Sequence, residues 1–188
     1  MSAACAGQQS LIPGTVSGNG PADARDRGPD PAPPGGRRTA SVTQVRVTLT
    51  PPTDPGAYPF VHAVRTHFAE TDAMGVIHHA AYLPYLEEAR VALLRDAGHP
   101  YDEVRLGGID LVVLEVLVQY RRPLRFDEEV VISMVVGQYT GATFQIAYLL
   151  QVGGETRATA VTVHGAIDRR GRPVRLPSWL ASPQFNLG

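Results

Sequence analysis

The sequence predicts an α+β domain in which an antiparallel sheet wraps around one long helix. Residues 80–98 carry apolar side chains at the spacing of an amphipathic helix, and four extended segments follow between residues 110 and 168. The first 56 residues differ sharply, because they hold nine of the 16 prolines and eight of the 19 glycines. We therefore expect a single domain over residues 57–183 and a disordered, Pro/Gly-rich tail over residues 1–56.

The tail prediction rests on composition. A segment such as GPDPAPPGGRR, residues 28–38, cannot bury enough apolar surface to offset the entropy lost on ordering. Residues 41–50 alternate well enough to form a short strand. The prolines of PPTDPG follow at once, so a linker with chance alternation is the favoured interpretation.

The long helix is preceded by an extended segment, residues 60–68, and by a polar turn, residues 70–79. Gly98 and Pro100 are typical of a helix end. Pro84 cannot donate to the carbonyl of Ala80, so either the regular helix begins near Pro84 or it is kinked there. One apolar stripe is expected to face the sheet, and a wetter side comprises Glu87, Glu88, Arg90, Arg95 and Asp96.

After a short helical turn at residues 101–108, the remaining segments predict strands in hairpin succession. The clearest turn signal is Gly153-Gly154, a two-residue hairpin connection. Glu115 lies inside an apolar segment, where we favour exposure to solvent over a role as a second acid in a pocket. The four predicted strands span residues 110–121, 129–139, 142–152 and 155–168.

Composition excludes several classes of function. The net charge of −1 gives no electrostatic reason to bind nucleic acid or an anionic membrane. All 17 basic residues are arginine, which excludes Schiff-base chemistry through a lysine and the lysine of a phosphate-binding P-loop. The only cysteine is Cys5, so neither a disulfide within the chain nor a cysteine metal cluster is expected. The sequence shows no signal peptide and no membrane span, so a cytoplasmic location is predicted.

The polar turn concentrates groups suited to acyl transfer. Asp72 lies between a predicted strand and helix, and Gly75 permits backbone conformations closed to other residues. His78 and His79 lie where the helix begins, and free backbone N–H groups there attract a developing negative charge. A carboxylate facing such amides can attack a carbonyl or activate water while the amides hold the oxyanion. The alternative is that Asp72 is only a turn former or helix cap.

The string TDAMGVIHHAAY, with YLEEAR and VQYRRPLRFDEEV after it, resembles the 4-hydroxybenzoyl-CoA thioesterase-like branch of the hotdog-fold superfamily. The similarity covers about residues 61–168. The resemblance implies a single hotdog domain, Asp72 as catalytic carboxylate and His79 as the residue whose backbone N–H polarises the thioester carbonyl. It also implies a homodimer or homotetramer with the pocket at a subunit interface. No metal or organic cofactor is expected.

Further residues are predicted to bind substrate. His78 and Tyr82 flank the predicted helix start, and we assign both to the substrate site. Arg121, Arg122 and Arg125 suit the three phosphates of coenzyme A. The alternative for these arginines is a solvated turn balanced by the acidic residues at positions 127–129.

The sequence therefore predicts an acyl-CoA thioesterase that releases a free acid and CoA. One alternative is an acyl-carrier-protein thioesterase of lipid or polyketide synthesis, which would use the same residues but depend less on the arginines. Another is a protein that binds acyl thioesters without catalysis.

Overall fold

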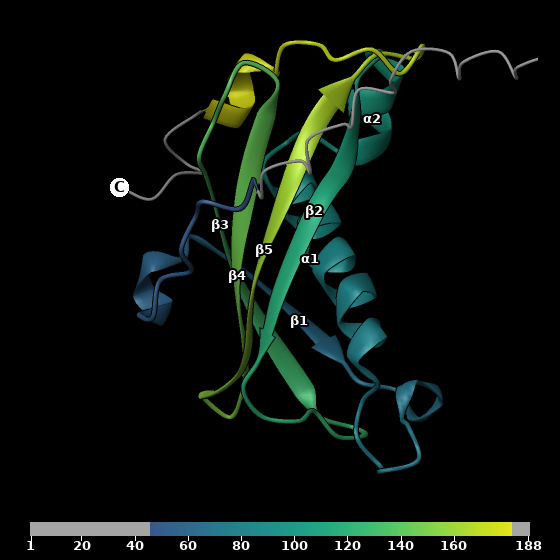
Figure 1. Cartoon of the computed structure of the whole chain (residues 1–188), viewed down its shortest axis with the longest axis vertical. Helices are drawn as coiled ribbons and strands as arrows, with labels where there is room; N and C mark the ends of the chain where they lie inside the picture. The colour runs from purple at the N-terminus through teal and green to yellow at the C-terminus, as the bar shows by residue number, and fades with distance from the viewer. Residues whose placement is uncertain (1–45, 182–188) are drawn as a thin grey trace, which may run out of the picture. The chain divides into compact units, whose positions relative to one another are not determined.

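The computed structural model describes residues 46–181 and confirms the predicted α+β class (Figure 1). Along the chain, one long helix and one short helix follow the first strand and precede the second. All the strands belong to one antiparallel sheet. Short 3₁₀ helices cover Pro55–Ala57, Phe68–Glu70, His79–Ala81 and Ser178–Ala181. The main elements are β1 (Phe60–Arg65), α1 (Tyr82–Asp96), α2 (Tyr101–Leu106), β2 (Asp110–Tyr120), β3 (Glu129–Gly137), β4 (Thr143–Val152) and β5 (Glu155–Ile167).

The five strands form one sheet in the order β1-β3-β4-β5-β2, with every neighbouring pair antiparallel. The β4–β5 hairpin turns at Gly153 and Gly154, both with positive φ, as the double glycine predicts. Strand β2 forms one edge of the sheet and pairs only with β5 among the described strands. Its 11 residues include an exposed apolar row, Val113, Leu114, Val116 and Leu117.

Helix α1 packs one face onto the sheet, as its spacing predicts. Leu86, Ala89 and Leu93 are each at most 3% exposed. Pro84 is the third residue of the helix, so its missing N–H falls within the first turn and breaks no interior hydrogen bond. One expectation was wrong, because Arg90 is buried rather than on the wet side.

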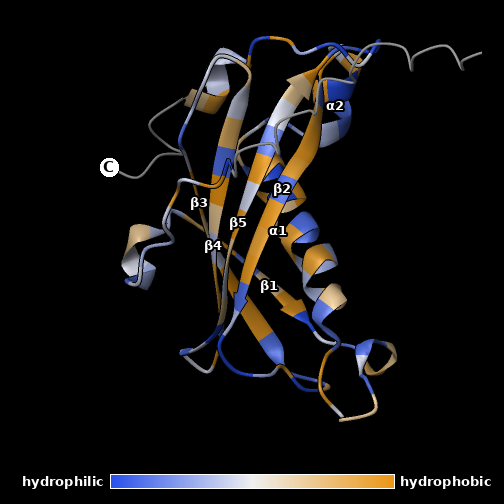
Figure 2. Cartoon of the chain, in the orientation of Figure 1, coloured by the Kyte–Doolittle hydropathy of each residue, from blue (hydrophilic) through white to orange (hydrophobic). Residues whose placement is uncertain are grey.

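The sheet buries apolar residues on both faces. In β4, Ile146 and Tyr148 join the main core under α1, whereas Ala147 and Leu149 belong to a second cluster. Since successive strand residues point to opposite faces, the second cluster lies on the face away from α1. Figure 2 shows the corresponding pattern, with strands that are mostly hydrophobic and a helix that alternates.

This outer face is covered by residues 46–58, which we call the strap. Leu49 and Tyr58 of the strap are only 7% and 5% exposed. The backbone N–H groups of Thr48 and Leu49 both donate to Oε1 of Gln145 on β4 at 3.0 Å. Residues 46–56, which composition assigned to the tail, therefore belong to the packed structure. Residues 46–50 are nevertheless not assigned to a strand.

The remainder of the predicted tail, residues 1–45, lies outside the described residues, as does the predicted domain end at residue 183. No helix within residues 46–181 is both long and apolar enough to cross a membrane.

Candidate active site

The segment from Thr71 to Ile77 forms a closed loop between β1 and α1. An antiparallel bridge pairs its two ends, and the N–H of Asp72 donates to the carbonyl of Val76 at 2.9 Å. Gly75 has φ +72°, a conformation that a side chain disfavours, and its N–H donates to the carbonyl of Asp72 at 3.0 Å. The loop is therefore a tight turn set by its own backbone, with Asp72 at its base.

The carboxylate of Asp72 is held on one side only. Its Oδ1 accepts from the N–H of Met74 at 2.8 Å and, more weakly, from that of Val76 at 3.4 Å. Among the described residues, no hydrogen bond reaches Oδ2. One oxygen thus fixes the orientation of the carboxylate, and the other is available for chemistry.

The backbone N–H groups of residues 78, 80 and 81, at the start of the helix, all have acceptors. The N–H of His78 donates to the carbonyl of Glu70 at 2.8 Å. The N–H groups of Ala80 and Ala81 donate to Nδ1 and to the carbonyl of His78 at 3.3 and 2.9 Å. Within residues 46–181, the N–H of His79 has no acceptor. It is the group that could donate to a developing oxyanion.

Tyr120, at the end of β2, holds the backbone of the same residue through its carbonyl. Its hydroxyl donates to the carbonyl of His79 at 3.0 Å, and its ring packs edge-on against Tyr82 at 4.9 Å between centroids. Tyr120 was not among the predicted site residues, because nothing local relates a strand end to a turn 41 residues earlier. The only sequence signal was its place next to the paired arginines.

A second link ties the loop to the helix through Glu70. Its Oε2 accepts from the hydroxyl of Tyr85 on α1 and from the N–H of His67 at 2.7 Å. Burial would raise the pKa of Glu70, but these hydrogen bonds outweigh it and hold that pKa below its ordinary value. The pKa of Tyr85 is raised by its burial and by the Glu70 carboxylate. The Asp72 loop is therefore fixed to α1 by a charged anchor.

Asp72 and His79 line one open groove of about 330 Å³. Tyr82, Arg121 and Arg122 line the same groove, so five predicted site residues come together although they are separated by up to 50 positions. Burial raises the pKa of Tyr82. The groove is lined by Asp72, Met74, Val76, Ile77, His79, Tyr82, Tyr120, Arg121, Arg122 and Pro123.

Proteins of known family and structure are similar to this chain over the part that contains the groove. A model of the thioesterase-like superfamily matches residues 66–184, more than half of the chain. The chain belongs to the thioesterase-like superfamily. The match begins just before the Asp72 loop and takes in every residue of the groove.

Individual relatives agree with this family. A crystal structure of a hypothetical protein from Aquifex aeolicus is 32% identical, with a TM-score of 0.63, and the match covers 65% of this chain and 97% of that one. The DHNA-CoA thioesterase of Staphylococcus aureus is 27% identical with a TM-score of 0.61, over 64% of this chain and 83% of that one. The acyl-CoA thioester hydrolase YbgC of Escherichia coli is 30% identical over 80 residues, which is 43% of this chain and 60% of that protein.

Three other predicted site residues, Gly75, His78 and Arg125, do not line the groove. The N–H of Gly75 is already bonded within the turn, so its contribution is the turn conformation. His78 caps the short 3₁₀ helix through Nδ1 and packs against the ring of His79 at 4.1 Å, but it does not line the groove. Arg125 is also absent from the lining; its N–H donates to Oε2 of Glu128 at 2.8 Å.

Glu115 does not line the groove either. Its Oε2 accepts from the N–H of Arg46 in the strap at 2.6 Å. Among residues 46–181, no three His, Cys, Asp or Glu side chains gather in a way that could hold a metal ion. Among the residues that line the groove, Asp72 is the single carboxylate, and His79 lines the groove with it.

Proposed function

We propose that the chain hydrolyses acyl-CoA thioesters to a free acid and CoA. The observation that carries this proposal is the placement of the Asp72 carboxylate and the His79 N–H on one groove. The similarity to the DHNA-CoA thioesterase of Staphylococcus aureus and to the acyl-CoA thioester hydrolase YbgC of Escherichia coli supports the same reaction.

In the proposed reaction, the thioester carbonyl oxygen accepts a hydrogen bond from the N–H of His79. Oδ2 of Asp72 either attacks the carbonyl carbon or removes a proton from the water that attacks it. In the general-base route the C–S bond then breaks, and the CoA sulfur takes up the proton that Asp72 removed from water. In the nucleophilic route CoA leaves as a thiolate and a mixed anhydride forms on Asp72. Water then hydrolyses this anhydride, and the proton released in that step goes to the CoA sulfur. Tyr120 positions the His79 backbone through the carbonyl of that residue, and the His79 ring can orient the thioester or the water.

We assign Arg121 and Arg122 to the phosphates of CoA. Both lie on the groove rim and are exposed, and the Arg122 guanidinium pairs with Glu155 at 2.8 Å. A surface ion pair of this kind contributes little to stability, so it can be exchanged for a phosphate. Arg125 is the weaker candidate because it lies off the groove.

We also propose a homodimer formed through the free edge of β2. Its exposed apolar residues include Val113 and Val116, and an unpaired strand edge of this length is a template for pairing with a second copy. Tyr120, the last residue of that strand, lines the groove, so the second copy would lie beside the site. A tetramer remains the alternative, and the predicted cytoplasmic location stays part of this proposal.

A hydrolysis screen tests the function. Purified protein is incubated with aliphatic and aromatic acyl-CoA thioesters, with matched acyl groups on a carrier protein, and with pantetheine thioesters, and the released thiol is measured. We expect turnover of at least one acyl-CoA class at a higher kcat/KM than its carrier-bound counterpart. Preference for the carrier-bound form would instead support the carrier-protein thioesterase, and binding without turnover would support the non-catalytic alternative.

A further inference from the structure

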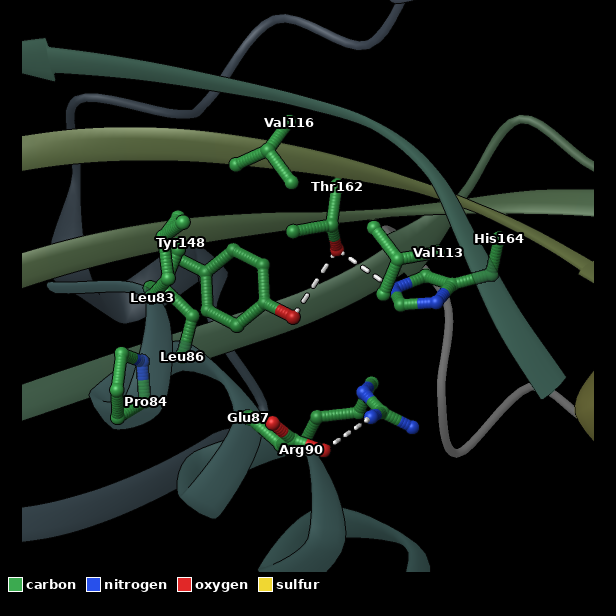
Figure 3. Close-up of a pocket in the computed structure, with 10 residues that line it drawn as sticks. All are labelled: Leu83, Pro84, Leu86, Glu87, Arg90, Val113, Val116, Tyr148, Thr162 and His164. Carbon is green, nitrogen blue, oxygen red and sulfur yellow. Dashed lines mark hydrogen bonds and ion pairs between the residues drawn. The ribbon is translucent and has the colours of Figure 1, made fainter. Parts of the chain in front are cut away.

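A second hollow, of about 280 Å³, lies between α1 and the sheet (Figure 3). Its walls divide into an apolar part and a polar part. The apolar part comes from Leu83, Pro84 and Leu86 on α1 and from Val113 and Val116 on β2. The polar part consists of Glu87, Arg90, Tyr148, Thr162 and His164. We call this hollow the Arg90 cavity.

The polar wall is a buried chain of hydrogen bonds that stops short. The hydroxyl of Tyr148 lies 3.1 Å from Oγ1 of Thr162, which lies 2.7 Å from Nε2 of His164. His164 is fully buried, and its ring stacks on Phe144 at 4.9 Å. Nδ1 of His164 is buried and has no partner within the described chain. A buried imidazole nitrogen without a partner leaves a hydrogen bond to be filled.

Arg90 lies across the cavity from this histidine. Its side chain is 6% exposed, yet its Nη1 is buried without a hydrogen-bond partner among residues 46–181. Its nearest carboxylate, Glu87, is 3.6 Å from Nη2 and has a side chain that is 71% exposed. A buried guanidinium with so weak a counterion is costly unless another acceptor reaches it.

Arg90 gives the cavity a positive charge, and His164 adds none because it is neutral. Burial, together with the charge of Arg90, lowers the pKa of His164 to about 3. The imidazole is therefore neutral near pH 7, and it can donate from Nδ1 when Nε2 accepts from Thr162. Arg90 and His164 thus offer two donors to one anionic group.

The Arg90 cavity and the Asp72 groove follow one another along the seam between α1 and β2. On the helix, Tyr82 lines the groove and the next residue, Leu83, lines the cavity. On the strand, Tyr120 lines the groove and Val116 lines the cavity. Four strand residues span about 13 Å. Arg90 follows His79 by eleven positions, which at the rise of a helix is about 16 Å, and the backward lean of the Arg90 side chain shortens this distance.

We propose that the Arg90 cavity receives the far end of the acyl group and selects acyl groups that end in a carboxylate. This inference rests on the proposed function, because it assumes that the thioester lies at Asp72. The carboxylate would accept from Nη1 of Arg90 and from Nδ1 of His164, while Leu83, Val113 and Val116 contact the methylene chain. A plain hydrocarbon end would leave both donors unsatisfied.

The test compares acyl-CoA pairs of equal chain length that end in a carboxylate or in a methyl group. In wild type we expect kcat/KM to favour the carboxylate member by about tenfold to hundredfold at the best length, the range of a hydrogen bond to a charged group. Arg90→Met should abolish this preference. Arg95→Met, which removes an exposed arginine from the same helix, should keep it.

Binding distinguishes this inference from the proposed function. Calorimetry with S-alkyl-CoA thioethers, which cannot be hydrolysed, compares the same carboxylate and methyl ends in wild type and variants. If no thioester is hydrolysed but the carboxylate thioether binds at least tenfold more tightly in an Arg90-dependent way, the cavity assignment holds and the catalytic proposal fails. If Arg90→Met does not fold, Arg90→Gln replaces it.

Equal affinity of wild type for both ends would overturn the inference, whether water or a carboxylate from a second copy fills the cavity. A preference that survives in a folded Arg90→Met or Arg90→Gln variant would overturn it as well.

Discussion

The Asp72 loop and the Arg90 cavity present polar groups in opposite ways. The loop is built from one stretch of chain, its backbone bonds orient the carboxylate, and its groove is open. The polar wall of the cavity comes from α1, β4 and β5, and all of its side chains except Glu87 are buried. The contrast teaches that a site formed by consecutive residues can be recognised by its motif, whereas one assembled across the fold cannot. We expect the local site to control turnover, and the assembled parts to control stability and selection.

The strap provides the largest expected effect on stability, since it is also assembled over long range. Leu49→Ala removes a side chain that is 7% exposed and packs on the outer face of the sheet. Burial of this kind is worth about 2–4 kcal/mol of unfolding free energy, while kcat should change little. Chemical denaturation and a hydrolysis assay measure the two effects. Thr50→Ala, at an exposed strap position, is the control. A loss below about 0.5 kcal/mol would show that the strap is not part of the packed domain.

His164 gives a pH-dependent effect of intermediate size. Its pKa is about 3 in the folded protein, below the ordinary value of 6.5, because burial and the Arg90 charge oppose protonation. The contribution of His164 to the free energy of unfolding is fully present above pH 6.5. It is lost as the pH falls toward 3, because in that range the histidine takes up a proton in the unfolded state but not in the folded state. Between pH 7.5 and 5 this costs about 2 kcal/mol, since each pH unit below 6.5 is worth about 1.4 kcal/mol. Urea denaturation should show that His164→Gln has a flatter pH dependence; parallel curves would contradict the assignment.

Arg121 and Arg122 test whether the groove binds the phosphates of CoA. Replacing both with Gln should raise KM for acyl-CoA about a hundredfold, because each charged hydrogen bond to a phosphate contributes on the order of 1.5 kcal/mol. A pantetheine thioester lacks the nucleotide phosphates and should be barely affected. Arg125→Gln is the matched control, since Arg125 does not line the groove. Equal changes with both substrates would favour the solvated-turn interpretation.

The smallest expected effect separates the His79 backbone from its side chain. His79→Ala removes the ring that packs against His78 but keeps the N–H. If the amide is the oxyanion donor, kcat should stay within about tenfold of wild type, because removing one donor typically costs 10²–10³. Steady-state kinetics with the best acyl-CoA decide it. A fall beyond about a hundredfold would assign the chemistry to the imidazole instead.

Much of the fold was predictable because its signals are local. The apolar spacing of α1, the glycines at 153 and 154 and the order of the strands needed no knowledge of distant contacts. The Asp72 loop was predictable for the same reason, since Gly75 and the helix start lie within seven positions of the carboxylate.

The parts that escaped prediction depend on partners far away in sequence. Arg90 was placed on the wet side by its charge, although it lies four positions after Leu86 and three before Leu93 and so falls on their buried stripe. Leu49 was assigned to the tail because the prolines after it outweighed its spacing, and Gln145, which binds the strap, is 96 positions away. Tyr120 reaches His79 only through the sheet.

The most direct test of the central claim is the kcat of Asp72→Asn on the best acyl-CoA substrate, measured at a matched concentration of folded protein. Asparagine keeps the size of the side chain and an oxygen that can accept from the N–H of Met74, but it removes the charge and the basicity. We predict that kcat falls by about 10²–10⁴-fold, while melting temperature and KM change little. A variant that keeps kcat within about tenfold of wild type would reduce Asp72 to a turn former and contradict the account.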